Sequence, residues 1–197
     1  MALFVILDPA GTAVLFAAMT PQDDAAARAE QARRACGIAF VVLAAFGLGG
    51  EGLLRALGIG LAAMKVTGGI LLFLTAADMV TGRGEARVGA REQQAATATA
   101  DDISVFPLAI PLLAGPGAMT TMVLLRARAA GNPALVGAII AALAVALLVT
   151  LAALLGARRV AGLLGETGAS VAGRVLGVLL AALAAQIALE GLRAALG

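Results

Sequence analysis

Two short motifs place polar and helix-breaking residues inside strongly apolar parts of the chain. The first motif, LDPAGT, contains Asp8, and the second, AGPGAMTT, contains Pro116. A proline has no backbone N–H and cannot continue a helical hydrogen-bond ladder, so each motif predicts a break followed by a new half-helix. With Asp8 or Gly115 as N-cap, the first turn of each half-helix would present free N–H groups. Those groups belong to Ala10, Gly11, Gly117 and Ala118.

The two predicted breaks differ in charge. A helix N-terminus carries roughly half a positive charge and several unpaired donors, which suits a carboxylate. The hydroxyls of Thr120 and Thr121 follow one turn into the second half-helix, where they bond either to a ligand or to carbonyl groups of the preceding turn. Asp8 makes the first motif negative, so the pair of breaks suits a zwitterion with its ammonium group near Asp8.

Asp8 is also the candidate proton carrier. A charged side chain within a bilayer costs about 2.5 to 3.5 kcal/mol on insertion scales, and such residues mark transport pathways and proton relays. Only seven residues precede Asp8, about 10 Å of helix, so a hydrated cap near the membrane surface is the alternative interpretation.

Other polar residues are secondary candidates. Thr75 and Gln186 are expected either to line the pathway or to bond between helices, and Asp78 is expected to pair with Arg83 at the interface. Glu51, Arg55 and Glu190 are expected at the interface as well. The chain has no His, and its one cysteine, Cys36, forms no internal disulfide, so no metal site or cofactor is predicted.

The amino-acid composition predicts that these motifs lie in a membrane protein. Of 197 residues 61% are hydrophobic and 13% charged, with a mean hydropathy of +1.01, which exceeds what a water-soluble core can bury. The 14 basic residues are scattered and the net charge is +2, so nucleic acid is not an expected partner. Six apolar segments are long enough to span a bilayer as helices. They cover about 2–20, 36–56, 60–81, 103–125, 134–156 and 171–193.

The chain divides into two similar parts, 1–82 and 103–197, joined by a flexible cytoplasmic linker over 83–102. Lys65 and Arg174 begin similar stretches at an offset of 174 − 65 = 109, and the two motif prolines, Pro9 and Pro116, are offset by 116 − 9 = 107. Each part has three spans, so the second copy enters the membrane in the opposite direction. The predicted fold is therefore an all-α membrane protein with two inverted-topology three-helix repeats and breaks in helices 1 and 4, an arrangement typical of transporters.

Charge and small residues predict further details. Eight arginines follow spans one, three and five, against four on the other side, which places both termini outside a plasma or inner membrane. Thr20 and Pro21 predict the start of a short interfacial helix over the first connector, and the initial MALFVIL is expected to belong to the mature fold. The small-residue faces with Gly137 and Gly177 predict close helix packing.

At these motifs the sequence resembles the MarC family of integral membrane proteins over nearly its whole length. The matching blocks are LDPAG with LFAAMT, KVTGGILLFLTAADMVTG, PLAIPLLAGPGAMTT and GASVAGRVLGVLLAALAAQIALEGL. The resemblance implies transport of small neutral amino acids, such as alanine and glycine, driven by a proton gradient. The direction of transport stays open, and export is one alternative. The chain departs from the family pattern at Val14, where a proline is frequent, and in the short segment before Asp8.

The resemblance and the breaks together define a predicted substrate site, and the partners expected are a small-molecule substrate and the lipid bilayer. The site residues are Asp8, Pro9, Ala10, Gly11, Thr12, Gly115, Pro116, Gly117, Ala118, Thr120 and Thr121. The alternatives are a transporter of another small solute, such as an organic acid or a drug, and a non-catalytic membrane assembly protein. An aspartyl protease using Asp8 and Asp78 is disfavoured because neither residue lies in a Gly-x-Gly-Asp context, so no enzyme is predicted.

Overall fold

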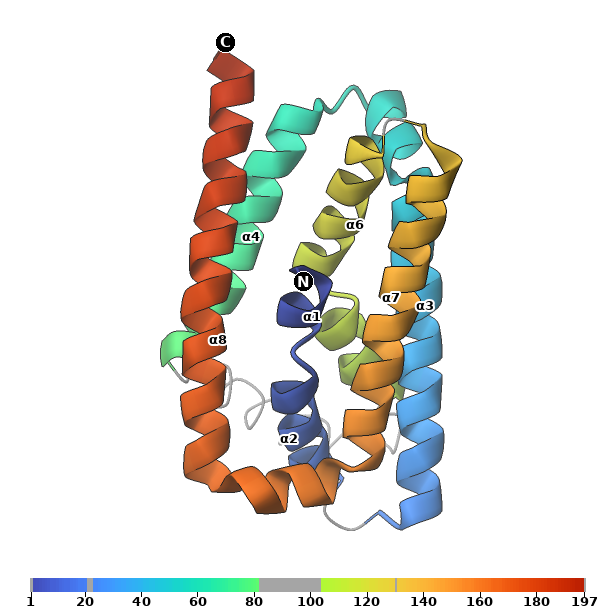
Figure 1. The fold of residues 1–197 in the computed structure, drawn as a ribbon, viewed down its shortest axis with the longest axis vertical. Helices are drawn as coiled ribbons and strands as arrows, with labels where there is room; N and C mark the ends of the chain where they lie inside the picture. The colour runs from blue at the N-terminus through green and yellow to red at the C-terminus, as the bar shows by residue number, and fades with distance from the viewer. Residues whose placement is uncertain (1, 21–22, 82–103, 130, 197) are drawn as a thin grey trace.

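The computed structural model describes residues 2–20, 23–81, 104–129 and 131–196, and every regular element in these ranges is a helix. Figure 1 shows the long helices running along the long axis of one bundle. The elements are α1 (Ala2–Leu7), α2 (Pro9–Met19), α3 (Ala25–Ala56), α4 (Leu61–Thr81), the π-helix η1 (Ser104–Leu113), α6 (Pro116–Arg128), α7 (Pro133–Leu155) and α8 (Ala157–Leu196). The all-α prediction is confirmed for this part of the chain, whereas the predicted linker over 83–102 lies outside it.

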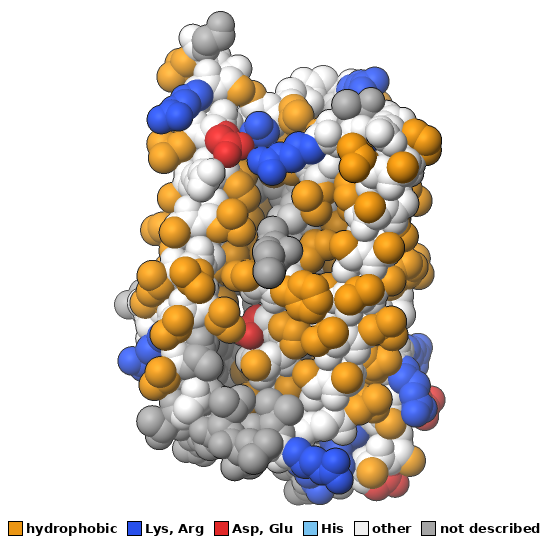
Figure 2. All heavy atoms as spheres, in the orientation of Figure 1, with side chains coloured by type: hydrophobic (Ala, Val, Ile, Leu, Met, Phe, Trp, Pro, Cys, Tyr) orange, Lys and Arg blue, Asp and Glu red, His pale blue; other side chains and the backbone are white. Residues whose placement is uncertain are grey.

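Four helical stretches are long and apolar enough to cross a membrane. They are Ala25–Ala56, Leu61–Thr81, Pro133–Leu155 and Arg174–Leu196. Their outer faces carry large exposed hydrophobic side chains, such as Val41, Leu148 and Val178, each more than half exposed. Figure 2 shows hydrophobic side chains across the middle of the molecule and most charged side chains near its two ends. This distribution matches a hydrocarbon layer between two polar interfaces.

The first and fourth predicted spans are each in two pieces. The first is interrupted at Asp8, between α1 and α2, and the fourth at Ala114 and Gly115, between η1 and α6. The first piece of the fourth span is wound as a π-helix, which sequence analysis did not anticipate. Prolines at 107 and 111 remove two N–H donors from this segment, and proline disfavours the usual i to i−4 bonding.

Two predicted connectors are continuous helix instead. The interfacial helix expected from Thr20 does not exist as a separate element, because α3 begins at Ala25 and continues without interruption to Ala56. Its N-cap is Asp24, whose Oδ1 accepts from the Ala27 N–H at 2.7 Å, while the Thr20 hydroxyl donates to the Phe16 carbonyl at the end of α2. No proline occurs within 25–56, so nothing in the sequence forces the helix to stop.

The last connector is also helical. Helix α8 begins at Ala157, directly after α7, and runs for 40 residues. Figure 1 shows that its first part crosses the end of the bundle before the helix turns along the long axis. The segment between the predicted spans 134–156 and 171–193 is thus helical, because the glycines there lower helix propensity without removing a hydrogen-bond donor.

The buried residues form two separate cores. The larger core joins α1, α2, α3, η1, α6 and α7, which we call the main bundle, and includes Phe16, Leu43 and Leu143. The smaller core lies between α4 and α8, the α4–α8 pair, and is built on Leu72 and Leu180. Contacts of α2 with α8 and of α4 with α6 cross the border between the two parts.

Glycines allow α4 and α8 to lie very close together. A Cβ added to Gly69 would lie 2.7 Å from the Ala184 carbonyl oxygen, and one added to Gly191 would lie 2.8 Å from the Val66 amide nitrogen. Because residues early in α4 meet residues late in α8, the two helices are antiparallel. The other predicted small-residue face is different: Gly137 on α7 is exposed and has no neighbour within 4 Å of its added Cβ.

These two glycines give opposite expectations on substitution. We expect Gly69→Ala to lower stability by about 1 to 3 kcal/mol, because its methyl group would overlap the α8 backbone. Gly137→Ala should leave stability unchanged or raise it by up to about 1 kcal/mol through the higher helix propensity of alanine. Thermal unfolding in one detergent measures both variants. Equal effects would contradict the close backbone contact.

Candidate functional site

The first helix break is shaped by Asp8. Its backbone adopts a left-handed conformation, with φ 39° and ψ 71°, which Asp tolerates better than most residues. Its Oδ1 accepts a hydrogen bond from the Gly11 N–H at 3.0 Å, so the side chain caps α2. The Thr12 hydroxyl donates to the Leu7 carbonyl at 2.9 Å, across the break. A single carboxylate therefore both ends one helix and starts the next.

Gly11 lies directly under this carboxylate. A Cβ added to Gly11 would lie 2.1 Å from Oδ2 of Asp8, well inside van der Waals contact. A side chain at residue 11 would therefore push the carboxylate off its cap. This arrangement corrects the sequence analysis at one point, because the Gly11 N–H is not free but is bonded to Asp8.

The second break has a different cap. Gly115 precedes α6 in an extended conformation, and no side chain caps the helix. Gly117 and Ala118, in the first turn, are both buried. The Thr120 hydroxyl donates to the Pro116 carbonyl at 2.8 Å, the within-helix alternative that the sequence left open. The first turn of α6 is thus a buried helix N-terminus without a side-chain partner.

Thr121 is the exceptional polar group at this break. The residue is 5% exposed, and its hydroxyl has no hydrogen-bond partner among the described residues. An unpaired buried hydroxyl costs about 1 to 3 kcal/mol, so such a group needs an explanation. Among the predicted site residues that the structure describes, Thr121 is the one whose buried hydroxyl forms no hydrogen bond.

The second break lies against the α4–α8 pair. A Cβ added to Gly117 would lie 2.3 Å from Cδ2 of Leu72, and one added to Gly68 would lie 1.9 Å from Cγ2 of Thr120. Leu72 therefore covers the Gly117 backbone, and Thr120 fits over Gly68. On this side, α4 therefore packs directly on the first turn of α6.

The two breaks are brought into one region of the molecule. Both lie near the middle of the long axis in Figure 1, and α1 contacts α6. Leu7, directly before Asp8, belongs to the same buried cluster as Ala114 and Ala118 beside the second break. The half-buried Asp8 is thus close to the middle of the bundle, not at either end.

The secondary candidates lie in different surroundings. Thr75 is on an exposed face of α4 and its hydroxyl donates to the Leu71 carbonyl at 3.0 Å, so it does not line an internal path here. Asp78 is half-buried on α4, and its predicted partner Arg83 lies outside the described residues. Gln186 is on an exposed face of α8 and donates from Nε2 to Oε1 of Glu190 at 3.5 Å.

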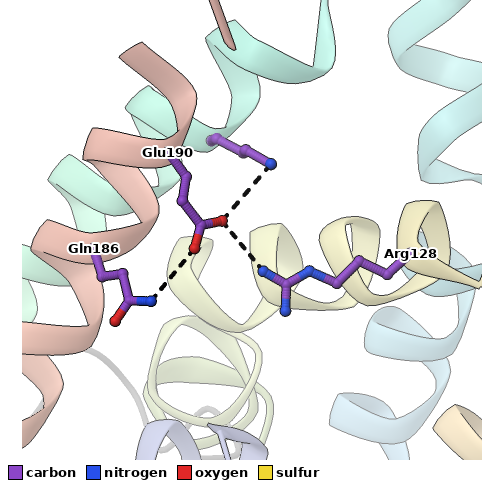
Figure 3. A network of polar contacts seen from close by, with 4 residues as sticks. Arg128, Gln186 and Glu190 are labelled. Carbon is purple, nitrogen blue, oxygen red and sulfur yellow. Dashed lines mark hydrogen bonds and ion pairs between the residues drawn. The ribbon is translucent and has the colours of Figure 1, made fainter. Parts of the chain in front are cut away.

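Glu190 is the centre of a charged network that sequence analysis missed. Its Oε2 lies 3.3 Å from Nη2 of Arg128 and 3.8 Å from Nζ of Lys65 (Figure 3). The sequence predicts an interfacial position for Glu190, a repeat position for Lys65 and an outer-side charge for Arg128, with no contact among the three. These three residues lie on three helices far apart in the chain, so no local sequence pattern predicts that they contact one another.

A hollow of about 360 Å³ opens between α1, α6 and α7. Its lining is apolar except for Arg128, and it includes Leu3, Phe4 and Leu125. None of the predicted substrate-site residues lines this hollow, so it is separate from the two breaks. Among the described residues no cluster of three or more His, Cys, Asp and Glu side chains suits a metal ion.

Comparison with known proteins gives a consistent result. The sequence matches the MarC family integral membrane proteins over residues 1–196. A UPF0056 membrane protein of Methanocaldococcus jannaschii is 38% identical, with 98% of this chain and 94% of that protein covered. Those of Archaeoglobus fulgidus and Escherichia coli (YhcE) are 34% and 30% identical, covering 96% and 97% of this chain and 88% of each relative. No solved structure matches the chain.

The Asp8 cap predicts a difference between two substitutions. Asp8→Ala removes the acceptor for the Gly11 N–H and the side chain that tolerates a positive φ, so we expect it to lower stability by about 1 to 2 kcal/mol. Asp8→Asn keeps a side-chain oxygen acceptor and tolerates the same backbone, so its stability should stay near that of the wild type. Thermal unfolding in detergent tests both. Equal destabilisation by Asn and Ala would show that capping is not the role of this side chain.

Proposed function

The chain belongs to the MarC family of integral membrane proteins, and on this basis we propose that it is a secondary transporter of small neutral amino acids, coupled to protons. The observation that carries the proposal is the pair of helix breaks, one with an acidic cap and one with no side-chain cap. The chain catalyses no covalent reaction in this proposal.

The helix contacts support an inverted repeat. In such a repeat, α1 corresponds to η1, α2 to α6, α3 to α7 and α4 to α8. Replacing each helix by its counterpart converts the α2–α8 contact into the α6–α4 contact, and the α3–α6 contact into the α7–α2 contact. It also turns α3–η1 into α7–α1. All of these pairs are in contact. The antiparallel packing of α4 on α8 is what a two-fold axis between these repeat-related helices requires.

An inverted repeat provides two related conformations. Exchanging the conformations of the two halves converts a state open on one side into a state open on the other, so the site is reached alternately from each side. The border between the α4–α8 pair and the main bundle is the surface along which this exchange would occur. The excess of arginines after spans one, three and five supports a cell-membrane location with both termini outside.

The chemistry of the two breaks favours a zwitterion. The buried first turn of α6 offers backbone donors and the positive end of the helix dipole to a carboxylate. The unpaired hydroxyl of Thr121 lies one turn farther along the helix and supplies another polar group. At the first break, Asp8 offers its carboxylate to the ammonium group of the same zwitterion. Close packing of Leu72 on Gly117 leaves little space, which favours small side chains such as those of glycine and alanine.

Purified protein in liposomes tests the function directly. We expect labelled alanine and glycine to accumulate when a pH gradient is imposed, because the proposed transport is proton-coupled. Protein-free liposomes provide the background. Uptake of neither amino acid by folded protein would contradict the proposal and favour another small solute, such as an organic acid or a drug. An absence of flux for those solutes too would favour a membrane assembly role.

Asp8→Asn tests the coupling. The substitution removes the titratable group but keeps a cap acceptor, so we expect accumulation driven by the pH gradient to be lost. Exchange of labelled for unlabelled alanine at saturating concentration should remain, since it requires no net proton movement. Both are measured in the same liposomes. Accumulation equal to that of the wild type would remove Asp8 from the proton pathway.

Thr121→Val tests the second break. Valine has nearly the same shape, so removing an unpaired buried hydroxyl should leave stability unchanged or raise it, while the KM for alanine rises about tenfold. Thr120→Val is the matched control, because its hydroxyl is already bonded to Pro116 and should contribute little to substrate binding. Initial uptake rates give both KM values. An unchanged KM for Thr121→Val would exclude its hydroxyl from the site.

A further inference from the structure

The charged network around Glu190 joins the two parts of the molecule. Glu190 and Lys65 belong to the α4–α8 pair, whereas Arg128 ends α6 in the main bundle. The Glu190–Lys65 contact therefore lies within one part, and the Glu190–Arg128 contact crosses the border. Figure 3 shows the two side chains extending toward each other from α8 and α6.

The network lies to one side of the helix breaks. Along α6, Arg128 follows the unpaired Thr121 by seven residues, and along α4, Lys65 precedes Leu72 by the same number. Seven residues of helix rise about 10 Å, so on both helices the charges lie two turns from the site. They are also at the end of the molecule where α6 finishes and α4 begins.

The repeat does not reproduce this network. At the 109-residue offset, Lys65 corresponds to Arg174 and Glu190 corresponds to Thr81, since 190 − 81 = 109. Thr81 has no charge, and its hydroxyl donates to the Ala77 carbonyl of its own helix. Position 81, which corresponds to Glu190 at this offset, therefore carries no carboxylate.

We propose that the Glu190–Arg128 ion pair is a one-sided gate that holds the α4–α8 pair against the main bundle and regulates access to the substrate site. This inference rests on the proposed transport function. Because the two conformations of an inverted repeat are otherwise similar in energy, an ion pair present at one end selects the conformation closed at that end. Lys65 neutralises Glu190 when Arg128 departs, so the carboxylate keeps a partner in the open state.

The exposure of the network suits a gate that opens. The side chains of Glu190 and Arg128 are 36% and 65% exposed, so water and salt weaken their attraction. Because both side chains already contact water, separating them leaves no buried charge without a partner, which would be costly.

Distances between spin labels test the gate without any substrate. Leu53→Cys on α3 and Leu192→Cys on α8 are exposed positions at the same end, one on each part, and Cys36→Ala removes the native thiol. In the labelled full chain, we expect Glu190→Gln and Arg128→Gln to raise the population with the longer distance about two- to fivefold. Pulsed electron paramagnetic resonance in lipid nanodiscs measures these populations.

Two matched variants should not raise the population with the longer distance. Lys65→Gln leaves the cross-border pair intact and removes the partner that Glu190 keeps in the open state, so that population should stay the same or fall. Glu51→Gln removes the ion pair with Arg55, an i,i+4 pair within α3 that crosses no border. Raising the salt concentration should shift the wild type toward the longer distance but leave the distances in Arg128→Gln unchanged. This salt test needs only one variant that folds.

Identical distance distributions for Arg128→Gln, Lys65→Gln and the wild type at low and high salt would overturn the gate. That result is distinguishable from failure of the proposed function, since a chain that transports no amino acid would still show the shift if the gate exists. Conversely, alanine accumulation with unchanged distances would retain the transporter and eliminate the gate.

Discussion

The structure depends on how a helix can be interrupted inside a bilayer. Hydrocarbon offers no partner for backbone N–H and carbonyl groups, so each group released by a break must be paired within the protein or by a ligand. At the first break Asp8 does this by capping α2 through Gly11. At the second break no side chain caps α6, although its first turn is buried. The two breaks thus meet the same constraint differently, and in the proposed function the second break is where the substrate carboxylate binds.

The position of these breaks gives the constraint a functional consequence. They lie near the border between two separately packed parts, where Leu72 covers Gly117 and Thr120 fits over Gly68. Within the α4–α8 pair, backbones are in contact at Gly69 and Gly191, and such contacts favour movement of the pair as one body. In the proposed function, relative movement of the two parts would uncover the substrate site with no need to unfold either part.

Charge distinguishes the two halves of the proposed repeat. The carboxylate at Glu190 contacts basic residues from both parts, whereas the equivalent Thr81 is neutral. Individual exposed ion pairs contribute only about 0.2 to 1 kcal/mol, which is small against the stability of a bundle. In the proposed transport cycle this is enough to change the populations of two conformations that an inverted repeat would make similar in energy. Under the proposed gate, a residue of little importance for folding influences which side of the molecule is closed.

The sequence determined the features that depend on local chemistry. Apolar length gave the membrane helices, and the prolines at 9 and 116 located both breaks, because a missing N–H interrupts a helix wherever it occurs. Local chemistry failed at the connectors, where Asp24 caps α3 in place of Thr20, and where the charged stretch after Gly156 continues as helix. Polarity alone does not stop a helix when no donor is removed.

Only the tertiary structure decided which groups meet. The sequence predicted Asp8 as the N-cap of α2, but its bond to the Gly11 N–H appeared only in the structure. The unpaired state of Thr121 and the joining of Arg128, Lys65 and Glu190 depend on helix packing. These contacts connect residues up to 125 positions apart, as 190 − 65 = 125 shows. A sequence records the type of each charge and hydroxyl, whereas the distance between them is set by how the helices that carry them pack.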